Sequence, residues 1–378
     1  MFSTCLPPAI RTGLWLAIAG FGAGCTSVAP GEAAWPGHLQ QLADRYGICD
    51  VAVAVVRQRA LQAVETANGC TVQTGPAEDT VFEAASLSKP VFAYAVLKLV
   101  QQGKMDLDAP ILRYLPHGYR HRHYIHLADS PVDLVTDPKL AAVTVRMALN
   151  HTAALPGWSG GPLAFDGIPG ARWQYSGEGY VLLQRAVETV TQKDLGTYMQ
   201  DEVFGPLGMT HSAWTREPRL EKHIAAGSDV YGNVMTSSPF REPVAAYSLY
   251  TSAGDYGRFL AALLQDHAAL RQITAAPVTA STKLNLRWGL GWGLEQGSAG
   301  SDDIYLWHWG NNLGYRAFVM ASPRTGDGFV LFTNSEKGLA LAEPVAQATL
   351  PGPHPVFRFH LLRDGLANWV CEVVEVCL

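Results

Sequence analysis

The chain has 378 residues, of which 48% are hydrophobic and 16% are charged, and its formal net charge is −5. This composition is typical of an ordered globular protein and excludes an intrinsically disordered chain. The slightly acidic balance gives no electrostatic basis for nucleic-acid binding, so no nucleic-acid partner is expected.

The first predicted element is an export signal over residues 1–25. Arg11 precedes the apolar stretch 14–21, which is too short to span a bilayer, and small residues then lead to Cys25. The stretch before this cysteine resembles the lipobox of bacterial lipoproteins, except that Gly22 replaces the usual leucine. Lipidation of Cys25 and ordinary cleavage both remain open. Either outcome predicts an exported bacterial protein, periplasmic or anchored to a membrane by a lipid.

A helix-like segment over 38–46 is followed by a predicted β-hairpin. The apolar runs 51–56 and 60–64 are separated by a short polar break, where the chain is expected to turn. In such a hairpin Cys49 and Cys70 lie almost opposite each other, and an exported protein can form disulfides. We therefore predict a Cys49–Cys70 bridge.

The last two cysteines are Cys371 and Cys377. They could pair by default, but one continuous helix would hold them too far apart to bridge, so their pairing stays open. The chain contains no C-x-x-C spacing, which argues against a zinc site built from cysteines.

Ser86 and Lys89 form the only Ser-x-x-Lys sequence of the chain, and the largely apolar run 90–100 follows them. Pro90 suits the first turn of a helix and Gly103 suits its end, so a buried helix is predicted to start at Ser86. Positions i and i+3 share one helical face, which brings the lysine within reach of the serine hydroxyl as a base reaches a nucleophile. The helix N-terminus would also favour an oxyanion on the attacked substrate. The alternative is that Ser86 only caps the helix and Lys89 extends to water.

Residues 106–266 have the pattern of helices and loops, and β-like runs return at 288–294, 304–309, 316–321 and 329–333. Strands at both ends with helices between them predict an α/β fold. One antiparallel sheet is built from both chain ends and flanked by helices, with a mostly helical domain inserted. The predicted divisions are an α/β domain over 38–110 and 280–345, an inserted domain over 111–279 and a C-terminal extension over 346–378.

Two further patterns offer competing sites. Residues 157–161 match the G-x-S-x-G motif around Ser159, but neither the strand before it nor the helix after it is present, so we reject this serine as the nucleophile. A group of histidines matches no standard ligand spacing, so we predict no metal site and interpret the segment as a solvated insertion. These histidines are His117, His121, His123 and His126.

The segment 173–180 (WQYSGEGY) completes a larger pattern. The chain resembles the serine β-lactamase-related hydrolases of class C type, which include penicillin-binding proteins, D-amino-acid peptidases and esterases. That family carries Ser-x-x-Lys, then Tyr-x-Asn, then Lys-x-Gly or His-x-Gly, in this order. Ser86, Tyr175 and His308 begin the corresponding sequences here, and further matches lie at 97–110, 150–156, 204–209 and 252–259.

The resemblance covers about residues 40–340 and implies a β-lactamase/transpeptidase-like fold. It implies two-step acyl transfer, in which Ser86 attacks the carbonyl of an ester, amide or peptide and water releases the acyl-enzyme. Lys89 or Tyr175 would take the serine proton, and the choice between them stays open. No cofactor is implied. A non-catalytic or slowly acylated sensor module of penicillin-binding type is the alternative function.

The resemblance also assigns substrate-binding residues at the end of a predicted strand. His308 would hold substrate or pass a proton, and its usual pKa of about 6.5 predicts activity that changes between mildly acidic and neutral pH. Gly310 would allow substrate to approach closely, and the Asn311 backbone N–H would complete an oxyanion hole with that of Ser86. Trp309 is bulky, and we expect it to narrow the pocket.

One departure from the family pattern is Gly177, which stands where asparagine is usual. Glycine cannot bond the lysine or a substrate amide, so β-lactam hydrolysis becomes less favoured than ester or peptide hydrolysis. Residues 231–233 fit Tyr-x-Asn literally but lie out of the family's order, so we interpret them as a chance match.

Overall fold

The computed structural model describes residues 35–70, 75–127, 129–236, 238–297 and 303–362. The predicted export signal with Cys25 lies outside these residues, as do Cys371 and Cys377. The described residues between Trp35 and Leu362 form a single unit, and the domain boundaries drawn from the sequence stay predictions. Among the described residues, no helix combines the length and the apolar character needed to cross a membrane.

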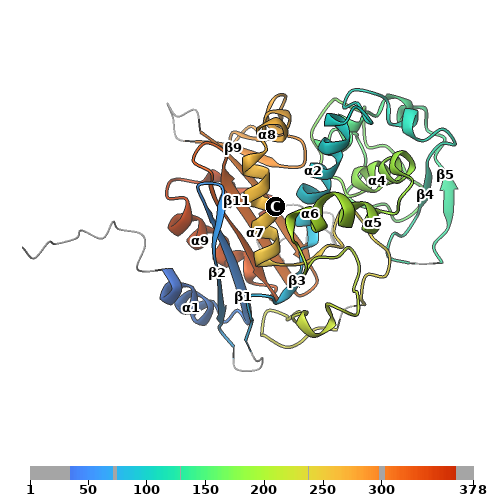
Figure 1. The fold of residues 1–378 in the computed structure, drawn as a ribbon. Coiled ribbons are helices and arrows are strands. Elements are labelled where there is room, and N and C mark those ends of the chain that lie inside the picture. Colours follow the sequence, from blue (N-terminus) through green and yellow to red (C-terminus); the bar gives the residue numbers. More distant parts are fainter. Residues whose placement is uncertain (1–34, 71–74, 128, 237, 298–302, 363–378) are drawn as a thin grey trace, which may run out of the picture. The chain divides into compact units, whose positions relative to one another are not determined.

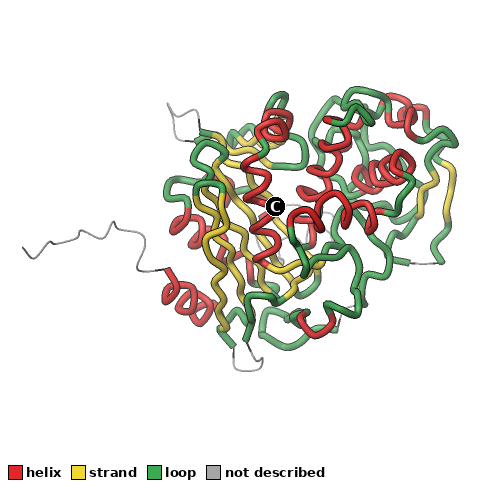
Figure 2. Tube along the Cα trace, in the orientation of Figure 1, coloured by secondary structure: helices red, strands yellow, loops and turns green. Residues whose placement is uncertain are grey.

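An eight-stranded antiparallel sheet is the centre of the fold, with the strand order β2-β1-β12-β11-β10-β9-β8-β7 (Figures 1 and 2). The first and last strands among the described residues, β1 and β12, pair with each other, which confirms that the sheet is built from both ends. The strands are β1 (Asp50–Arg57), β2 (Ala60–Asn68), β7 (Val278–Ser281), β8 (Leu286–Trp288), β9 (Gly293–Gln296), β10 (Ile304–Asn312), β11 (Tyr315–Ser322) and β12 (Asp327–Thr333).

The sheet lies between two apolar cores because neighbouring residues of a strand point to opposite faces. In β1, Ala52 and Ala54 belong to one core, whereas Val51 and Val53 belong to the other. Helices α2 and α7 contribute to the first core, and helices α1 and α9 to the second (Figure 1). A strand buried on both faces explains why the β1 sequence is continuously apolar rather than alternating.

The helices on the α2 side extend the first core away from the sheet, with α4 and α5 lying beyond α2 in Figure 1. The helices are α1 (Trp35–Tyr46), α2 (Ser88–Gln101), α3 (Val145–Leu149), α4 (Glu178–Thr191), α5 (Leu195–Met199), α6 (Gly205–Leu207), α7 (Ala253–Gln265), α8 (His267–Thr274) and α9 (Ala342–Thr349).

The predicted strand over 288–294 is wrong in its extent. The chain turns at Gly289–Trp292 between β8 and β9, and the Gly289 N–H donates to the Trp292 carbonyl at 2.8 Å. Gly291 has φ of +80°, and a Cβ there would lie 2.3 Å from that of Ala93 in α2. This glycine lets the turn pass directly beside the helix, a constraint that an apolar run does not reveal.

Two small strand pairs outside the main sheet were not predicted. They join segments with little local β pattern, and each strand is only three residues long. The pairs are β3 (Val81–Glu83) with β6 (Tyr250–Ser252), and β4 (Arg120–Arg122) with β5 (Val132–Leu134).

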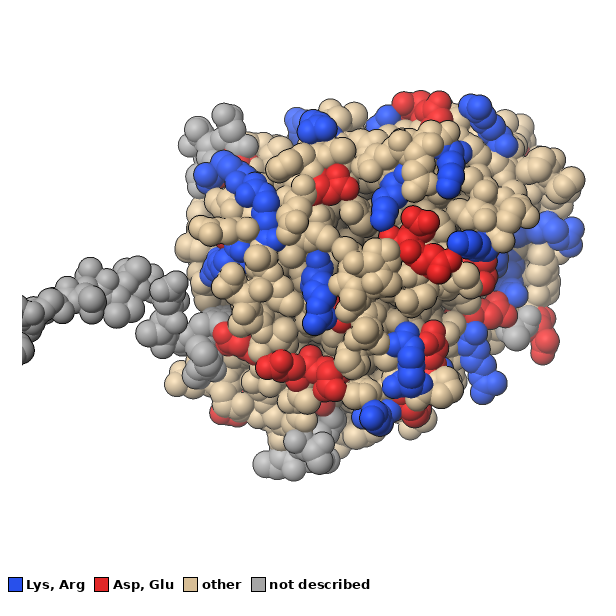
Figure 3. All heavy atoms as spheres, viewed as in Figure 1, with Lys and Arg blue, Asp and Glu red and all other residues tan. Residues whose placement is uncertain are grey.

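Charged side chains are interspersed on the face drawn in Figure 3, where Lys and Arg alternate with Asp and Glu over short distances. Charges of both signs at close spacing cancel at longer range. The described residues on this face therefore form no extended surface of one sign.

The hairpin of β1 and β2 has the predicted turn and disulfide. Gln58 and Arg59 occupy the turn with φ of +47° and +66°, and Cys49 and Cys70 are bonded with their Cα atoms 4.7 Å apart. The bond closes a loop of sequence separation 21 across the base of the hairpin.

We expect replacement of Cys49 and Cys70 by serine to lower the free energy of unfolding by about 3 kcal/mol, because the bond restricts the unfolded chain. Urea unfolding of the oxidised protein measures this loss. The wild-type protein in reductant should show the same loss, and the double variant should not respond to reductant. Equal stabilities of the oxidised wild type and the variant would contradict the assignment.

Candidate active site

A short turn carries Ser86 between β3 and α2. Ala85 begins this turn with φ of +50°, a left-handed conformation that costs about 1 kcal/mol or more for a residue with a side chain. Ser86 is only partly buried, although Ala85 and Leu87 on either side of it are fully buried. The Ser88 hydroxyl donates to the Ala85 carbonyl at 2.6 Å and holds the turn. The fold thus presents one hydroxyl to solvent from an otherwise closed segment.

Lys89 lies directly beneath this hydroxyl. Its Nζ donates to Ser86 Oγ at 3.0 Å and to the Ala246 carbonyl at 2.8 Å. The lysine is 1% exposed, and burial lowers its pKa to about 7. The capping alternative is wrong, because the N-cap of α2 is Leu87 without a side-chain cap, and Lys89 does not reach water.

Tyr175 lies beside this pair from the loop before α4. Lys89 Nζ is 4.8 Å from the centre of the Tyr175 ring. Among the described residues, the buried Tyr175 hydroxyl forms no hydrogen bond of ordinary geometry. Burial raises the pKa of Tyr175, and the nearby Ser86 hydroxyl offsets the rise only in part. Tyr175 is therefore a neutral phenol near pH 7.

His308 faces the same core as α2, because its neighbours in β10, Trp307 and Trp309, point into the opposite core. Its Nδ1–H donates to the Trp309 carbonyl at 2.8 Å, which leaves Nε2 as an acceptor without a partner among the described residues. Burial, and then the charge of Lys89, lower the pKa of His308 to about 3. With this pKa the imidazole is neutral at mildly acidic pH and above, which argues against a titrating His308, and the pH sensitivity expected from this residue stays a prediction.

His151 is a second buried imidazole in the same group, 4.5 Å from the Tyr175 ring between centroids. Its Nδ1 accepts a hydrogen bond from the Ser176 N–H at 3.1 Å. Burial, followed by the charges of Lys89 and His308, lowers the pKa of His151 well below its usual range. Of Lys89, Tyr175, His151 and His308, Lys89 is thus the one whose pKa lies near neutral.

Gly310 fits β10 against the turn that carries Ser86. A Cβ at Gly310 would lie 2.5 Å from the Ala84 carbonyl oxygen and 3.2 Å from the Ala85 Cβ. The sequence predicts that substrate approaches Gly310 closely. In the structure, the backbone of the Ser86 turn is the group that lies this close to Gly310. On its other side, β10 pairs with β9 only as far as Trp307, so its edge from His308 to Asn312 has no strand partner there among the described residues.

A cavity of about 250 Å³ opens at Ser86 and is also lined by Asn311. Trp158, Phe240 and Tyr247 supply its aromatic walls. Trp309, which was expected to narrow the pocket, instead packs into the second core, with its ring 4.8 Å from that of Tyr175. That expectation is wrong for this cavity, because Trp309 is not among its lining residues, and the Trp309 ring packs against Tyr175 and against His308, the latter at 5.2 Å between ring centres.

Trp158 explains the glycine at position 177. A Cβ at Gly177 would lie 2.5 Å from Cη2 and 2.6 Å from Cζ2 of the Trp158 indole. The ring thus occupies the space into which an asparagine side chain would extend. Glycine at position 177 is thus required by Trp158, which lies nineteen positions earlier and lines the cavity.

The two rejected motifs have structural roles away from Lys89. Ser159 lies in a loop, and its hydroxyl donates to the Gly161 carbonyl at 2.8 Å. Tyr231 is 87% exposed in a turn held by Asp229, whose carboxylate accepts from the Tyr231 N–H. Neither Ser159 nor Tyr231 lines the cavity at Ser86, although Trp158 of the first motif does.

The four histidines of 117–126 are dispersed rather than gathered. His117 is exposed, His123 pairs with Asp133, and the Nδ1 atom of His126 bonds the Tyr247 hydroxyl at 2.9 Å. The solvated-insertion interpretation is wrong for His121, which is 1% exposed and bonds Glu178 at 3.2 Å.

Sequence reasoning missed several contributors to this site. Ala246 acts through its carbonyl, for which no sequence signal exists, and Trp158 was considered only as part of a rejected motif. Glu83, three residues before Ser86, also lines the cavity and accepts a 2.8 Å hydrogen bond from Asn312 Nδ2. The one pattern that would have placed Glu83 near the site is the alternation of side chains along a strand that ends just before Ser86.

Comparisons with known proteins agree with this arrangement. A family model described as "Beta-lactamase" matches residues 36–350. Esterase EstB of Burkholderia gladioli is 29% identical over 329 residues, covering 68% of this chain and 78% of the esterase. Protein flp of Staphylococcus aureus (strain COL) is 22% identical over 281 residues, covering 68% of this chain and 53% of flp. The chain therefore spans about half the length of flp.

Two solved structures share the fold. D-alanine carboxypeptidase AmpC from Burkholderia cenocepacia has a TM-score of 0.65 and 20% identity, covering 79% of this chain and 92% of that one. The D-amino acid amidase from Ochrobactrum anthropi SV3 has a TM-score of 0.67 and 22% identity, covering 83% and 96%. At these identities the likeness concerns the arrangement of the backbone.

We expect the reaction of Ser86 with a fluorophosphonate to be about tenfold slower at pH 6 than at pH 8, with a midpoint near 7. Lys89 must be neutral to accept the Ser86 proton, and its pKa of about 7 makes that form scarce in acid. Labelling rates across this range measure the effect. His308→Gln should keep the midpoint, since His308 is already neutral. A midpoint that moves with His308, or a flat profile, would contradict the assignment.

Proposed function

Because this chain belongs to the beta-lactamase family, we propose that it is an exported serine hydrolase that cleaves an ester, amide or peptide through an acyl-enzyme on Ser86. The observation that carries the proposal is the hydrogen bond between a buried lysine and a partly exposed serine. A serine hydroxyl becomes an effective nucleophile when a neighbouring base takes its proton.

In the proposed first step, neutral Lys89 takes the proton of Ser86 while Oγ bonds the substrate carbonyl carbon. The resulting oxyanion collapses, the bond to the leaving alcohol or amine breaks, and the proton passes to that leaving group. Water then attacks the acyl-enzyme with the same base and releases the acid and Ser86. Lys89 is favoured as the base because its pKa is about 7, whereas burial keeps the Tyr175 phenol protonated.

The remaining roles follow from groups around the cavity. Tyr175 would carry the proton between Lys89 and the leaving group, and the N–H groups of Ser86 and Asn311 would bind the oxyanion. His308 would accept a hydrogen bond at Nε2, because its Nδ1–H is already donated to a carbonyl. An acceptor at this position suits the N–H or O–H of a substrate better than a carboxylate.

The size and walls of the cavity support a small substrate. About 250 Å³ bounded by Trp158, Phe240 and Tyr247 holds a short acyl or aromatic group. An esterase is among the relatives and a D-amino acid amidase among the structural neighbours, so simple esters and D-amino-acid amides are the first substrates to test. β-Lactams are less favoured, because Trp158 fills the position of the usual asparagine.

Export belongs to the same proposal. It rests on residues 1–25, with periplasmic placement or a lipid anchor at Cys25 as the two outcomes. The Cys49–Cys70 disulfide supports export, because such bonds persist in oxidising compartments.

We expect wild-type protein to hydrolyse a p-nitrophenyl ester and Ser86→Ala to lose more than about a thousandfold in kcat/KM, because the covalent step is removed. Lys89→Ala should lose a comparable amount. Ser159→Ala is the matched control, since its serine lies in the rejected motif, and it should retain activity. Mass mapping after fluorophosphonate or fluorescent penicillin treatment should place the label on Ser86.

Two outcomes would contradict this proposal in different ways. A label that survives Ser86→Ala would remove Ser86 as the nucleophile. A label on Ser86 without turnover of esters, D-amino-acid amides or a chromogenic cephalosporin would favour the slowly acylated sensor module.

We expect Gly177→Asn to destabilise the protein by about 1–3 kcal/mol, because the new side chain overlaps the Trp158 ring. In a Trp158→Ala background the same change should cost less than about 0.5 kcal/mol. Urea unfolding of the four proteins gives this coupling. Gly161→Asn is the control, since a Cβ at Gly161 meets nothing within 4 Å. Costs that add independently of Trp158 would contradict the coupling.

A further inference from the structure

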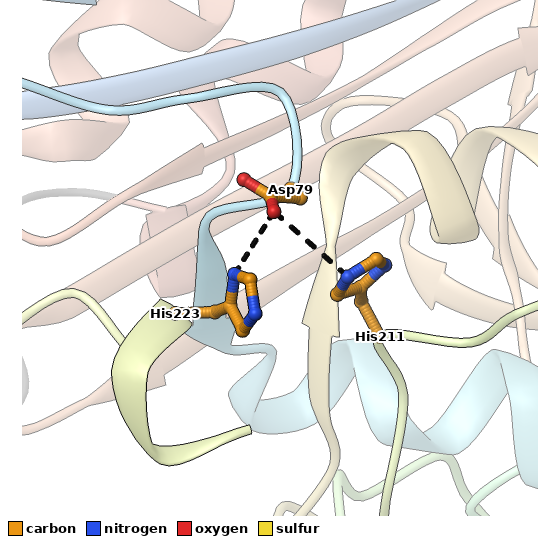
Figure 4. Close-up of side chains that lie close together, drawn as sticks. All are labelled: Asp79, His211 and His223. Atoms are coloured by element: carbon orange, nitrogen blue, oxygen red, sulfur yellow. Dashed lines mark ion pairs between the residues drawn. The ribbon is translucent and has the colours of Figure 1, made fainter. Parts of the chain in front are cut away.

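Outside the cavity, Asp79, His211 and His223 point toward one another from three separate segments (Figure 4). Asp79 lies in the turn before β3, His211 follows α6, and His223 ends a 3₁₀ helix over Glu221–His223. One ligand atom from each residue lies within 4.8 Å of the others, and all three residues are partly buried. Among the described residues, this is the group of histidines and carboxylates with metal-binding geometry.

The distances between the three possible ligand atoms are close to those of a metal site, and one of them is too long. Asp79 Oδ2 is 2.9 Å from His223 Nδ1 and 4.0 Å from His211 Nε2. Tetrahedral zinc with bonds of 2.0–2.2 Å places its ligand atoms about 3.3 Å apart. A small movement of His211 would therefore bring all three atoms to a shared ion.

Neighbouring groups already hold the segments that carry His211 and Asp79. The His211 backbone N–H donates to Asp255 at 2.7 Å, and Nδ1 of His211 lies 3.3 Å from Thr210 Oγ1. Histidine ligands of metals usually hold their second ring nitrogen in such a bond, which leaves the other nitrogen for the ion. The turn carrying Asp79 is held by the Ala77 N–H, which donates to Thr80 Oγ1 at 2.8 Å.

A simple ion pair explains only part of this arrangement. His223 and Asp79 are within hydrogen-bond distance, but His211 at 4.0 Å is not, although its ring lies 5.1 Å from that of His223 between centroids. Two imidazole nitrogens and one carboxylate oxygen are a donor set that suits zinc, and partial exposure leaves room for a water ligand.

We propose that Asp79, His211 and His223 form a binding site for a divalent transition-metal ion, with zinc as the expected ion. The ion would link the turn before β3, which carries Asp79, to the segments that carry His211 and His223. Ile224, next to His223, forms a β-bridge with Val81, and the Ala225 N–H donates to the Val81 carbonyl at 2.9 Å. Because β3 leads into the turn carrying Ser86, the ion stabilises the support of that turn and takes no part in its chemistry. This proposal does not depend on the proposed hydrolase activity.

The test uses the full chain, freed of any affinity tag and dialysed against a chelator. Isothermal titration with zinc should give one site, and zinc should raise the melting temperature. His211→Ala and His223→Ala should each lose both effects, whereas His117→Ala, which removes an exposed histidine elsewhere, should keep them. No zinc binding, or binding unchanged in the first two variants, would overturn the proposal and leave an ion pair.

A second measurement on the wild-type chain covers the case in which a variant fails to fold. Zinc should protect His211 and His223 from diethylpyrocarbonate, as mapped by mass spectrometry, while His117 stays reactive. Cobalt in place of zinc should give a visible spectrum without a thiolate charge-transfer band. Equal modification with and without zinc, or a thiolate band that assigns the ion to cysteines, would overturn the proposal.

Discussion

The burial of Lys89 is the constraint on which the rest of the site depends. Its ammonium group is removed from water and donates hydrogen bonds to a hydroxyl and a carbonyl. Among the described residues, no salt bridge pairs it with a carboxylate. Without a counter-charge, desolvation favours the neutral amine and brings the pKa to about 7. His151 and His308 lie in the same low-dielectric region, and the charge of Lys89 further lowers the pKa of each. The cluster therefore holds at most one proton's charge near neutral pH, and that proton belongs to the lysine.

The fold enforces this burial by bringing β10 and α2 together around the Ser86 turn. Gly310 removes the side chain that would otherwise separate β10 from the Ala84 carbonyl, and Gly291 does the same between the β8–β9 turn and Ala93. The left-handed Ala85 then directs Ser86 outward from a closed segment. Strain at Ala85 is tolerated because the packing on both sides leaves the turn no alternative, which is a common arrangement at reactive positions.

Much of this could be predicted from the sequence because its signals are local. The Ser-x-x-Lys spacing and the apolar run after it predict a helix with both side chains on one face. The two apolar runs on either side of Arg59 predict the hairpin. What could not be predicted depends on contacts between distant segments. The pKa of His308 is lowered by burial among segments that are distant in the sequence. Trp309 likewise packs against Tyr175, far away in the sequence, and does not line the cavity. The contact of Trp158 with Gly177 could not be predicted either, because no sequence pattern shows that a ring occupies the space beside a glycine nineteen positions later.

The charge distribution at the cavity restricts the substrates that the proposed hydrolase can favour. None of the residues lining it is a lysine or arginine, and Glu83 contributes an acid whose pKa is raised to about 7 by burial. The position that carries lysine in much of the family holds His308, which stays neutral. Above pH 7, Lys89 is also largely uncharged, so among the described residues that line the cavity or lie directly beneath Ser86 no cation remains to pair with a substrate carboxylate. A neutral or amino-bearing acyl group therefore meets less electrostatic opposition there than an anionic one, and this separates ester and amide substrates from peptides that end in a free carboxylate.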